Sequence, residues 1–75
     1  MTTTPATLLG SAIRAARRRL GFTQGELAHA AGISHASVIG LYERGAREPS
    51  LRVTVQIARA LGLDLNSVAE CFPAN

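Results

Sequence analysis

Apolar residues recur at helical spacing along most of the chain. Over residues 8–20, four of them share one face at steps of four, three and four: Leu9, Ile13, Ala16 and Leu20. No segment alternates apolar and polar residues as a half-buried strand would. The pattern therefore predicts an all-helical protein whose first helix covers about residues 8–20 and is ended by Gly21.

Capping residues predict where the next helix begins. Thr23 and Glu26 have the spacing of a capping box, in which each side chain accepts a hydrogen bond from the other residue's backbone N–H. Phe22 and Leu27 have the spacing of the hydrophobic staple that accompanies such a cap. We therefore expect a second helix over about residues 24–31.

The second and third predicted helices have the layout of a helix-turn-helix. They meet at Ala31-Gly32-Ile33-Ser34, a tight turn that contains a glycine. Ser34 is a good N-cap, so the third helix is expected to begin after it and to end before Gly45. Ala28 is small, as it must be where two helices cross closely, and Gly32 supplies the positive φ that a residue with a Cβ resists.

Two further helices are predicted toward the C-terminus. Ser50 is the N-cap of a fourth helix that runs to about residue 61, and its inner face consists of Leu51, Val55, Ala58 and Leu61. A fifth helix begins at Asp64 and ends before Pro73, with an apolar stripe of Leu65, Val68, Ala69 and Phe72. The predicted fold class is all-α: a compact five-helix bundle over residues 7–73, preceded by a flexible tail of residues 1–6.

The charge balance points to a polyanionic partner. The chain has 75 residues, enough for one domain, and a formal net charge of +3. All of its basic residues are arginines, whose planar fork donates two parallel hydrogen bonds to phosphate or guanine. GC-rich coding bias also explains the missing lysine, so the net charge is the stronger argument for a nucleic-acid partner.

Signals for other protein classes are missing from the sequence. There is no apolar run of membrane-spanning length, and the N-terminus lacks the basic start and apolar block of a secretory signal. The single cysteine, Cys71, has no partner for an internal disulfide, which favours a reducing cytoplasm. Cys71, His29 and His35 show no metal-ligand spacing, and no serine, histidine and carboxylate grouping indicates catalysis. We expect a cytoplasmic protein that is not an enzyme and needs no metal or cofactor.

These motifs resemble the Cro/repressor-type, lambda-repressor-like helix-turn-helix domains, also called the xenobiotic-response-element family. The resemblance covers residues 8–72 and rests on the following segments in this order: Ile13-Arg14 and Arg17, Gly21-Phe22-Thr23-Gln24, Glu26-Leu27-Ala28, Gly32-Ile33-Ser34, Glu43-Arg44-Gly45, Pro49-Ser50-Leu51 and Ala58-Arg59-Ala60-Leu61-Gly62. The family fold is a compact bundle of five helices. The resemblance implies a sequence-specific double-stranded DNA-binding transcriptional regulator, a dimeric repressor of the phage-repressor, controller-protein or antitoxin kind.

One departure from the family pattern affects the third helix. Over residues 32–45 the chain is one residue longer than the pattern, and one extra residue rotates a helix by about 100°. The spacing from the turn places Val38 and Leu41 in the core, whereas the Glu-Arg-Gly ending places Ile39 and Tyr42 there. The sequence therefore leaves open which later side chains of this helix face DNA.

The start of the third helix holds the expected base-reading residues. Recognition helices of this type place their N-terminal residues against base edges in the major groove. The expected readers are His35, Ala36, Ser37 and Gly40. His35 and Ser37 both donate and accept hydrogen bonds, and Ala36 suits a thymine methyl group. The alternative is that these are merely exposed residues at a helix start.

A second group is expected to bind phosphate and to position the protein on the duplex. It consists of Thr23, Gln24, Ser34, Arg18, Arg44 and Arg47. The resemblance implies that Gln24 braces the motif and bonds the DNA backbone. Arg44 and Arg47 flank the loop after the recognition helix, and Arg18 is favoured among the arginines of the first helix. The alternative for each is a solvent-exposed side chain.

Two structural roles complete the expected set. The resemblance implies an ion pair between Arg17 and Glu43 that pins the first helix to the third, with a phosphate contact by Arg17 as the alternative. The expected dimer interface consists of Leu63, Leu65, Phe72 and Pro73. The alternative is that these apolar residues only close the core of the monomer.

The predicted partners are a DNA operator and a second copy of the chain. A protein partner, such as a toxin or RNA polymerase, is not identified by the sequence. The alternative function is a protein-interaction adaptor that uses the same helical bundle, because fold does not fix function. Gln24 and the basic loop over residues 44–47 favour DNA, because an adaptor has no reason to carry them.

Overall fold

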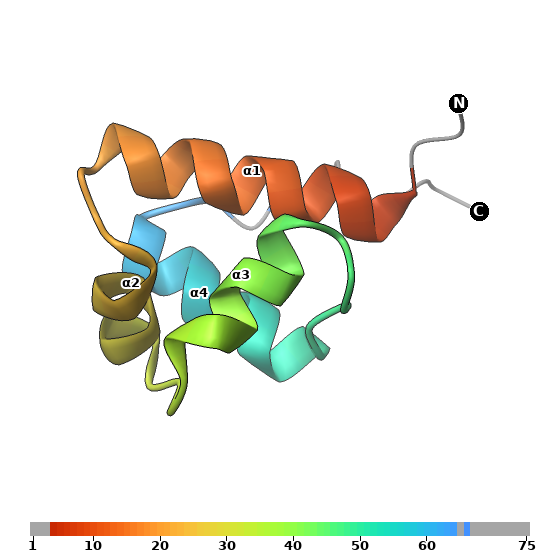
Figure 1. Ribbon diagram of the computed structural model, residues 1–75. Helices are drawn as coiled ribbons and strands as arrows, with labels where there is room; N and C mark the ends of the chain where they lie inside the picture. Colours follow the sequence, from red (N-terminus) through yellow and green to blue (C-terminus); the bar gives the residue numbers. More distant parts are fainter. Residues whose placement is uncertain (1–3, 65, 67–75) are drawn as a thin grey trace.

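Four helices build the part of the chain that the computed structural model describes, residues 4–64 and 66. They are α1 (Pro5–Arg19), α2 (Gln24–Ala31), α3 (Ala36–Glu43) and α4 (Leu51–Leu61). Figure 1 shows α1 running along one side of the molecule, with α2 and α3 beneath it and α4 behind α3. Because α3 packs against both α1 and α2, its exposed side is held in one orientation.

The first helix begins earlier than the sequence predicted. Thr4 is its N-cap, and the Thr4 Oγ1 accepts a hydrogen bond from the Thr7 backbone N–H at 3.1 Å. Pro5 suits the first turn, where a backbone N–H has no partner in the helix. Residues 5 and 6, which we assigned to a flexible tail, therefore belong to α1. The helix ends at Arg19, so Leu20 lies beyond it and is 47% exposed.

The core lies where the four helices meet. Its largest fully buried side chains are Leu9, Ile13, Leu27, Ile39 and Ile57. The predicted inner face of α4 is partly wrong, because Leu51 is 81% exposed and Val55 is only half-buried. Thr54 is buried with Ile57, Ala58 and Leu61. Its hydroxyl donates to the Ser50 carbonyl oxygen at 2.8 Å, which satisfies the polar atom inside the core.

The register of α3 follows its C-terminal end. Ile39 is 0% exposed and Tyr42 is 6% exposed, whereas Val38 and Leu41 are only half-buried. The core positions are therefore the pair that the Glu-Arg-Gly ending indicated.

The extra residue is accommodated in the turn before α3. The helix begins at Ala36, and His35 is its N-cap without a side-chain hydrogen bond. The prediction that Ser34 is the N-cap was wrong. Backbone hydrogen bonds from the Gly45 N–H to the Tyr42 carbonyl and from the Ala46 N–H to the Leu41 carbonyl hold the end of α3. Because this end is fixed, the extra residue within residues 32–45 moves the start of the helix.

The predicted fifth helix starts at the edge of the described residues. Asp64 is exposed, and its Oδ1 accepts a hydrogen bond from the Asn66 backbone N–H at 2.7 Å. The remainder of that prediction, including Leu65 and Phe72, lies outside the described residues, as does Cys71. None of the helices in the described part is long and apolar enough to span a membrane.

Candidate nucleic-acid interface

The helix-turn-helix is built by α2, the turn over residues 32–35, and α3. The Thr23 backbone N–H donates to Glu26 Oε1 at 2.9 Å, and the Glu26 backbone N–H donates to Thr23 Oγ1 at 3.0 Å. Both hydrogen bonds of the predicted capping box are therefore present, and they hold the pKa of Glu26 below its usual value. At the other end of α2, Gly32 has a φ of 73°, and the Ile33 N–H donates to the Ala28 carbonyl oxygen.

An ion pair fixes α3 to α1. Arg17 Nε lies 2.6 Å from Glu43 Oε2, and Arg17 Nη2 donates to Glu43 Oε1 at 3.1 Å. The two side chains are 12% and 4% exposed, so the pair is largely removed from water. The hydrogen bond to Glu43 is the main reason that the pKa of Arg17 is raised. Arg17 Nη1 also donates to the Phe22 carbonyl oxygen at 2.8 Å, so one guanidinium connects α1, α3 and the segment before α2.

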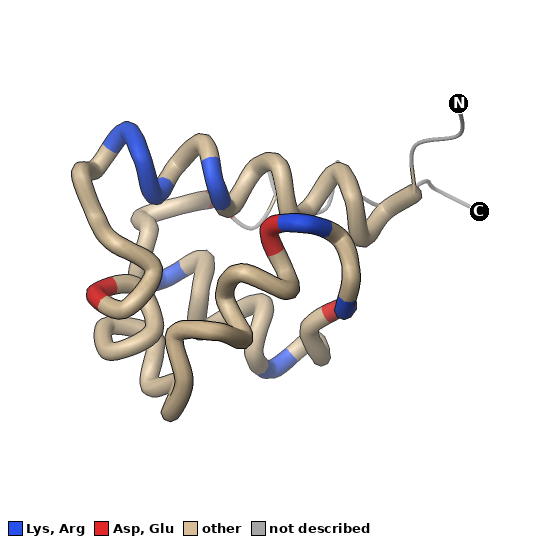
Figure 2. Tube along the Cα trace, viewed as in Figure 1, with Lys and Arg blue, Asp and Glu red and all other residues tan. Residues whose placement is uncertain are grey.

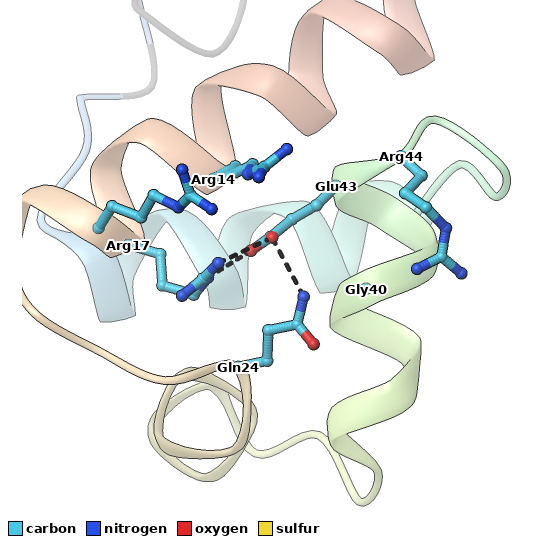
Figure 3. Close-up of a pocket in the computed structure, with 7 residues that line it drawn as sticks. Arg14, Arg17, Gln24, Gly40, Glu43 and Arg44 are labelled. Carbon is cyan, nitrogen blue, oxygen red and sulfur yellow. Dashed lines mark hydrogen bonds and ion pairs between the residues drawn. The ribbon is translucent and has the colours of Figure 1, made fainter.

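Gln24 joins the same network from the first turn of α2. Its Nε2 donates to Glu43 Oε1 at 3.3 Å, so this carboxylate oxygen receives donors from two different helices. Figure 3 shows Gln24, Arg17 and Glu43 converging between the helices. Gln24 is half-buried and thus braces α2 against α3.

Beside this network lies a groove with a strong excess of positive charge. It is lined by Arg14, Arg17, Arg18, Gln24, Gly40, Glu43 and Arg44. Four arginines face a single carboxylate there, and that carboxylate already binds Arg17. Figure 2 shows basic residues gathered at the end of α1 and just after α3. Arg14 is not among the phosphate-binding residues that the sequence predicts, although its spacing of four residues from Arg18 places both on one side of α1.

The expected base-reading residues fall into two environments. His35, Ala36 and Ser37 are exposed at the start of α3. Gly40 is buried, because the side chains of Gln24 and Arg44 lie over it (Figure 3).

The remaining expected residues are distributed around the motif. Thr23, Ser34, Arg18, Arg44 and Arg47 are exposed. Of the four residues expected at a dimer interface, only Leu63 is described, and it is half-buried against the core. Leu65, Phe72 and Pro73 lie outside the described residues. Within residues 4–64 and 66, no group of three histidine, cysteine or acidic residues is arranged to hold a metal ion.

Similar sequences are found in bacteria and archaea. The family described as Helix-turn-helix matches residues 13–68. An uncharacterized HTH-type transcriptional regulator of Methanothermobacter thermautotrophicus is 48% identical over 50 residues, which are 67% of this chain and 71% of that protein. The HTH-type transcriptional regulator YazB of Bacillus subtilis, also uncharacterized, is 39% identical over 64 residues, which are 85% of this chain and 91% of YazB.

Solved structures share the same arrangement of helices. The restriction-modification controller protein C.AhdI from Aeromonas hydrophila has a TM-score of 0.77 at 30% identity, covering 84% of this chain and 94% of that one. Two structures of the clp gene regulator ClgR from Corynebacterium glutamicum match, one with a TM-score of 0.82 at 30% identity, covering 93% of this chain and 90% of that one, and one with a TM-score of 0.80 at 31% identity, covering 89% and 70%.

Proposed function

The chain belongs to the helix-turn-helix family, as its motifs indicated, and from this premise we propose that it is a sequence-specific double-stranded DNA-binding transcriptional regulator. Relatives named as transcriptional regulators, and structural neighbours named as a controller protein and a gene regulator, support the proposal. The observation that carries it is the groove with four arginines, which is lined by the C-terminal half of α3, the same helix whose start is exposed.

The proposed docking places α3 in the major groove. In helix-turn-helix complexes the second helix of the motif enters this groove with its N-terminal residues against the bases. His35, Ala36 and Ser37 are exposed at that end of α3 and are proposed to contact base edges. Gly40 is buried under the side chains of Gln24 and Arg44, so it would act on the duplex only through them.

Phosphate contacts are proposed on both sides of α3. Thr23 and Gln24 stand at the N-terminus of α2, where the helix dipole and free backbone N–H groups favour an anion. Ser34 lies in the turn, Arg18 lies on α1 and Arg47 lies in the loop after α3. Such contacts position a protein on DNA without reading its sequence.

We further propose that two copies bind a two-fold operator and repress transcription. A single domain of this kind covers only a few base pairs, and specific affinity usually needs a larger interface. Two recognition helices about 34 Å apart would enter successive major grooves. Sedimentation with and without operator tests this, because a monomer that saturates one half-site in both conditions would contradict dimerisation. A cytoplasmic location is proposed because a transcriptional regulator must meet its DNA operator there.

The test of the function begins with selection of bound fragments from random duplex. Affinity for the selected site should then fall steeply with salt, because each neutralised phosphate releases counterions. A protein-interaction adaptor would select no sequence and would show little duplex binding at either low or high salt. That result would reject the proposed function.

Arg47→Ala should weaken binding to selected and unselected duplex alike. The loss of one phosphate contact should reduce the slope of log affinity against log salt by about one unit. Arg59→Ala is the matched control, because Arg59 is also exposed but lies on α4, outside the motif. If both variants change the slope equally, the effect is one of net charge and Arg47 is not at the interface.

His35→Ala should cost about 1–3 kcal/mol on the selected site and relax the preference at one or two base pairs. The folded state should be little affected, because the His35 side chain makes no capping hydrogen bond. The loss of affinity in the His35→Ala variant would therefore come from a lost DNA contact and not from unfolding. His29→Ala, at an exposed position of α2, is the control. Equal weakening on every sequence would remove His35 from the reading residues.

A further inference from the structure

After the N-cap His35, the exposed side of α3 begins with short side chains. Ala36 and Ser37 are exposed there, and Gly40, one turn later, is buried under the side chains of Gln24 and Arg44. On the opposite side of the helix, the side chains of Ile39 and Tyr42 are buried in the core. Because the side chains of Ala36 and Ser37 are short, this part of α3 can approach the floor of a major groove closely. The same two side chains offer few hydrogen-bond donors to base edges.

Arg44 supplies a second long donor, further along this side of α3 than His35. It follows Ser37 by seven residues and therefore lies on the same side of α3. A side chain at this position points back toward the N-terminus of the helix, over the preceding turn. Figure 3 shows the Arg44 side chain running back along α3 to the level of Gly40.

The absence of a side chain at Gly40 provides the space for this arrangement. A Cβ at position 40 would lie 3.3 Å from Arg44 Nη1 and 3.4 Å from Gln24 Oε1. Gln24 also donates a hydrogen bond to Glu43, which limits its movement. A Cβ at position 40 would therefore press on the Arg44 guanidinium and displace it slightly from its position along α3.

The fork of Arg44 is available to a ligand. Within residues 4–64 and 66, the only ion pair joins Arg17 to Glu43. No carboxylate in that part of the chain therefore pairs with Arg44. Arg44 is also exposed. An arginine fork presented in the major groove matches the O6 and N7 acceptors of guanine.

We propose that Arg44 is a specificity-determining residue that reads a guanine, and that Gly40 is the positioning residue that lets its guanidinium lie along the groove-facing side of α3. The inference rests on the proposed DNA-binding function and replaces the expectation that Arg44 binds phosphate. One helical turn is about 5.4 Å, and base pairs are about 3.4 Å apart. The guanine should therefore lie one to two base pairs from the position that Ser37 meets.

The test compares Arg44→Ala, Arg44→Lys and Gly40→Ala on the selected site and on duplexes in which each of its guanines is replaced in turn. Arg44→Ala should reduce the affinity for the selected site by about tenfold to a hundredfold. Replacing one particular guanine of the site should then no longer change the affinity of the variant. Arg44→Lys keeps the charge without the fork, so it should keep the salt dependence but not the preference for guanine. Gly40→Ala should weaken the preference at the same base pair.

Arg59→Lys is the control, because Arg59 is exposed on α4 outside the motif, and the change should leave every base preference intact. If Arg44→Lys keeps the full affinity of the wild type, and Arg44→Ala weakens binding to all sequences equally, then Arg44 is a phosphate ligand and the inference is wrong. In that case the wild-type protein still selects a sequence, so the proposed function stands. A wild-type protein that selects no sequence would instead reject the function itself.

Discussion

Arg17→Met should lower the free energy of unfolding by about 3 kcal/mol, because it leaves a buried carboxylate without its cationic partner. Glu43 is 4% exposed, and the amide of Gln24 is the other donor that the structure gives it. A 75-residue domain typically has about 4–11 kcal/mol of stability, so this loss is a large share. The melting temperature should fall by about 12 °C or more.

Two variants make this measurement specific. Arg18→Met removes the same charge from the neighbouring exposed position and should change the melting temperature little. Arg17→Met combined with Glu43→Leu removes both charges and should recover part of the loss, because an apolar pair carries no desolvation penalty.

The opposite pattern would assign a different role to Arg17. If Arg17→Met and Arg18→Met melt at the same temperature, and only the Arg17 variant loses DNA affinity, Arg17 is a phosphate ligand. The geometry argues against this, because Arg17 already donates to Glu43 and to the Phe22 carbonyl oxygen.

Gly10→Ala should destabilise the protein by about 1–3 kcal/mol, although alanine favours helices. Gly10 lies where α1 crosses the C-terminal end of α3. A Cβ there would lie 2.8 Å from the Glu43 carbonyl oxygen and closer still to that of Tyr42. Both are backbone atoms of a packed helix, so the two helices would have to move apart.

Gly25→Ala is the matched control. It also replaces a helical glycine, but its Cβ would meet the nearest atoms at an ordinary 3.9 Å. This variant should therefore gain up to about 1 kcal/mol from helix propensity. Urea unfolding of both variants gives the comparison. If both gain stability, the contact between α1 and α3 is looser than the structure indicates.

Gly10 and Arg17 both contact the last turn of α3, which positions this helix against α1 and α2. Glu43 meets the backbone of α1 at Gly10 and the side chains of Arg17 and Gln24. The position of α3 relative to α1 and α2 thus depends on the last turn of α3. Since the exposed start of α3 is the proposed reading surface, a change at Gly10 or Arg17 should also weaken DNA binding without touching DNA.

Much of the local structure could be predicted from the sequence, because it depends on neighbouring residues. The capping box of Thr23 and Glu26 and the glycine that ends each helix satisfy backbone groups within one turn of the chain. The all-helical class follows from the spacing of apolar residues in the same way. The partnership of Arg17 and Glu43, which are 26 residues apart, was available only through resemblance to a family.

The tertiary structure decided the features that depend on several helices at once. An extra residue before the Glu-Arg-Gly ending fits equally well in a turn or in a helix, and the local sequence does not distinguish them. Packing of Ile39 and Tyr42, together with the Arg17–Glu43 pair, holds the end of α3 and places the extra residue in the turn. Similarly, Thr54 is buried in place of Leu51, because the Ser50 carbonyl satisfies its hydroxyl. The side chain of Gln24 lies over Gly40 only because α2 packs beside α3, a contact between distant residues that no local pattern encodes.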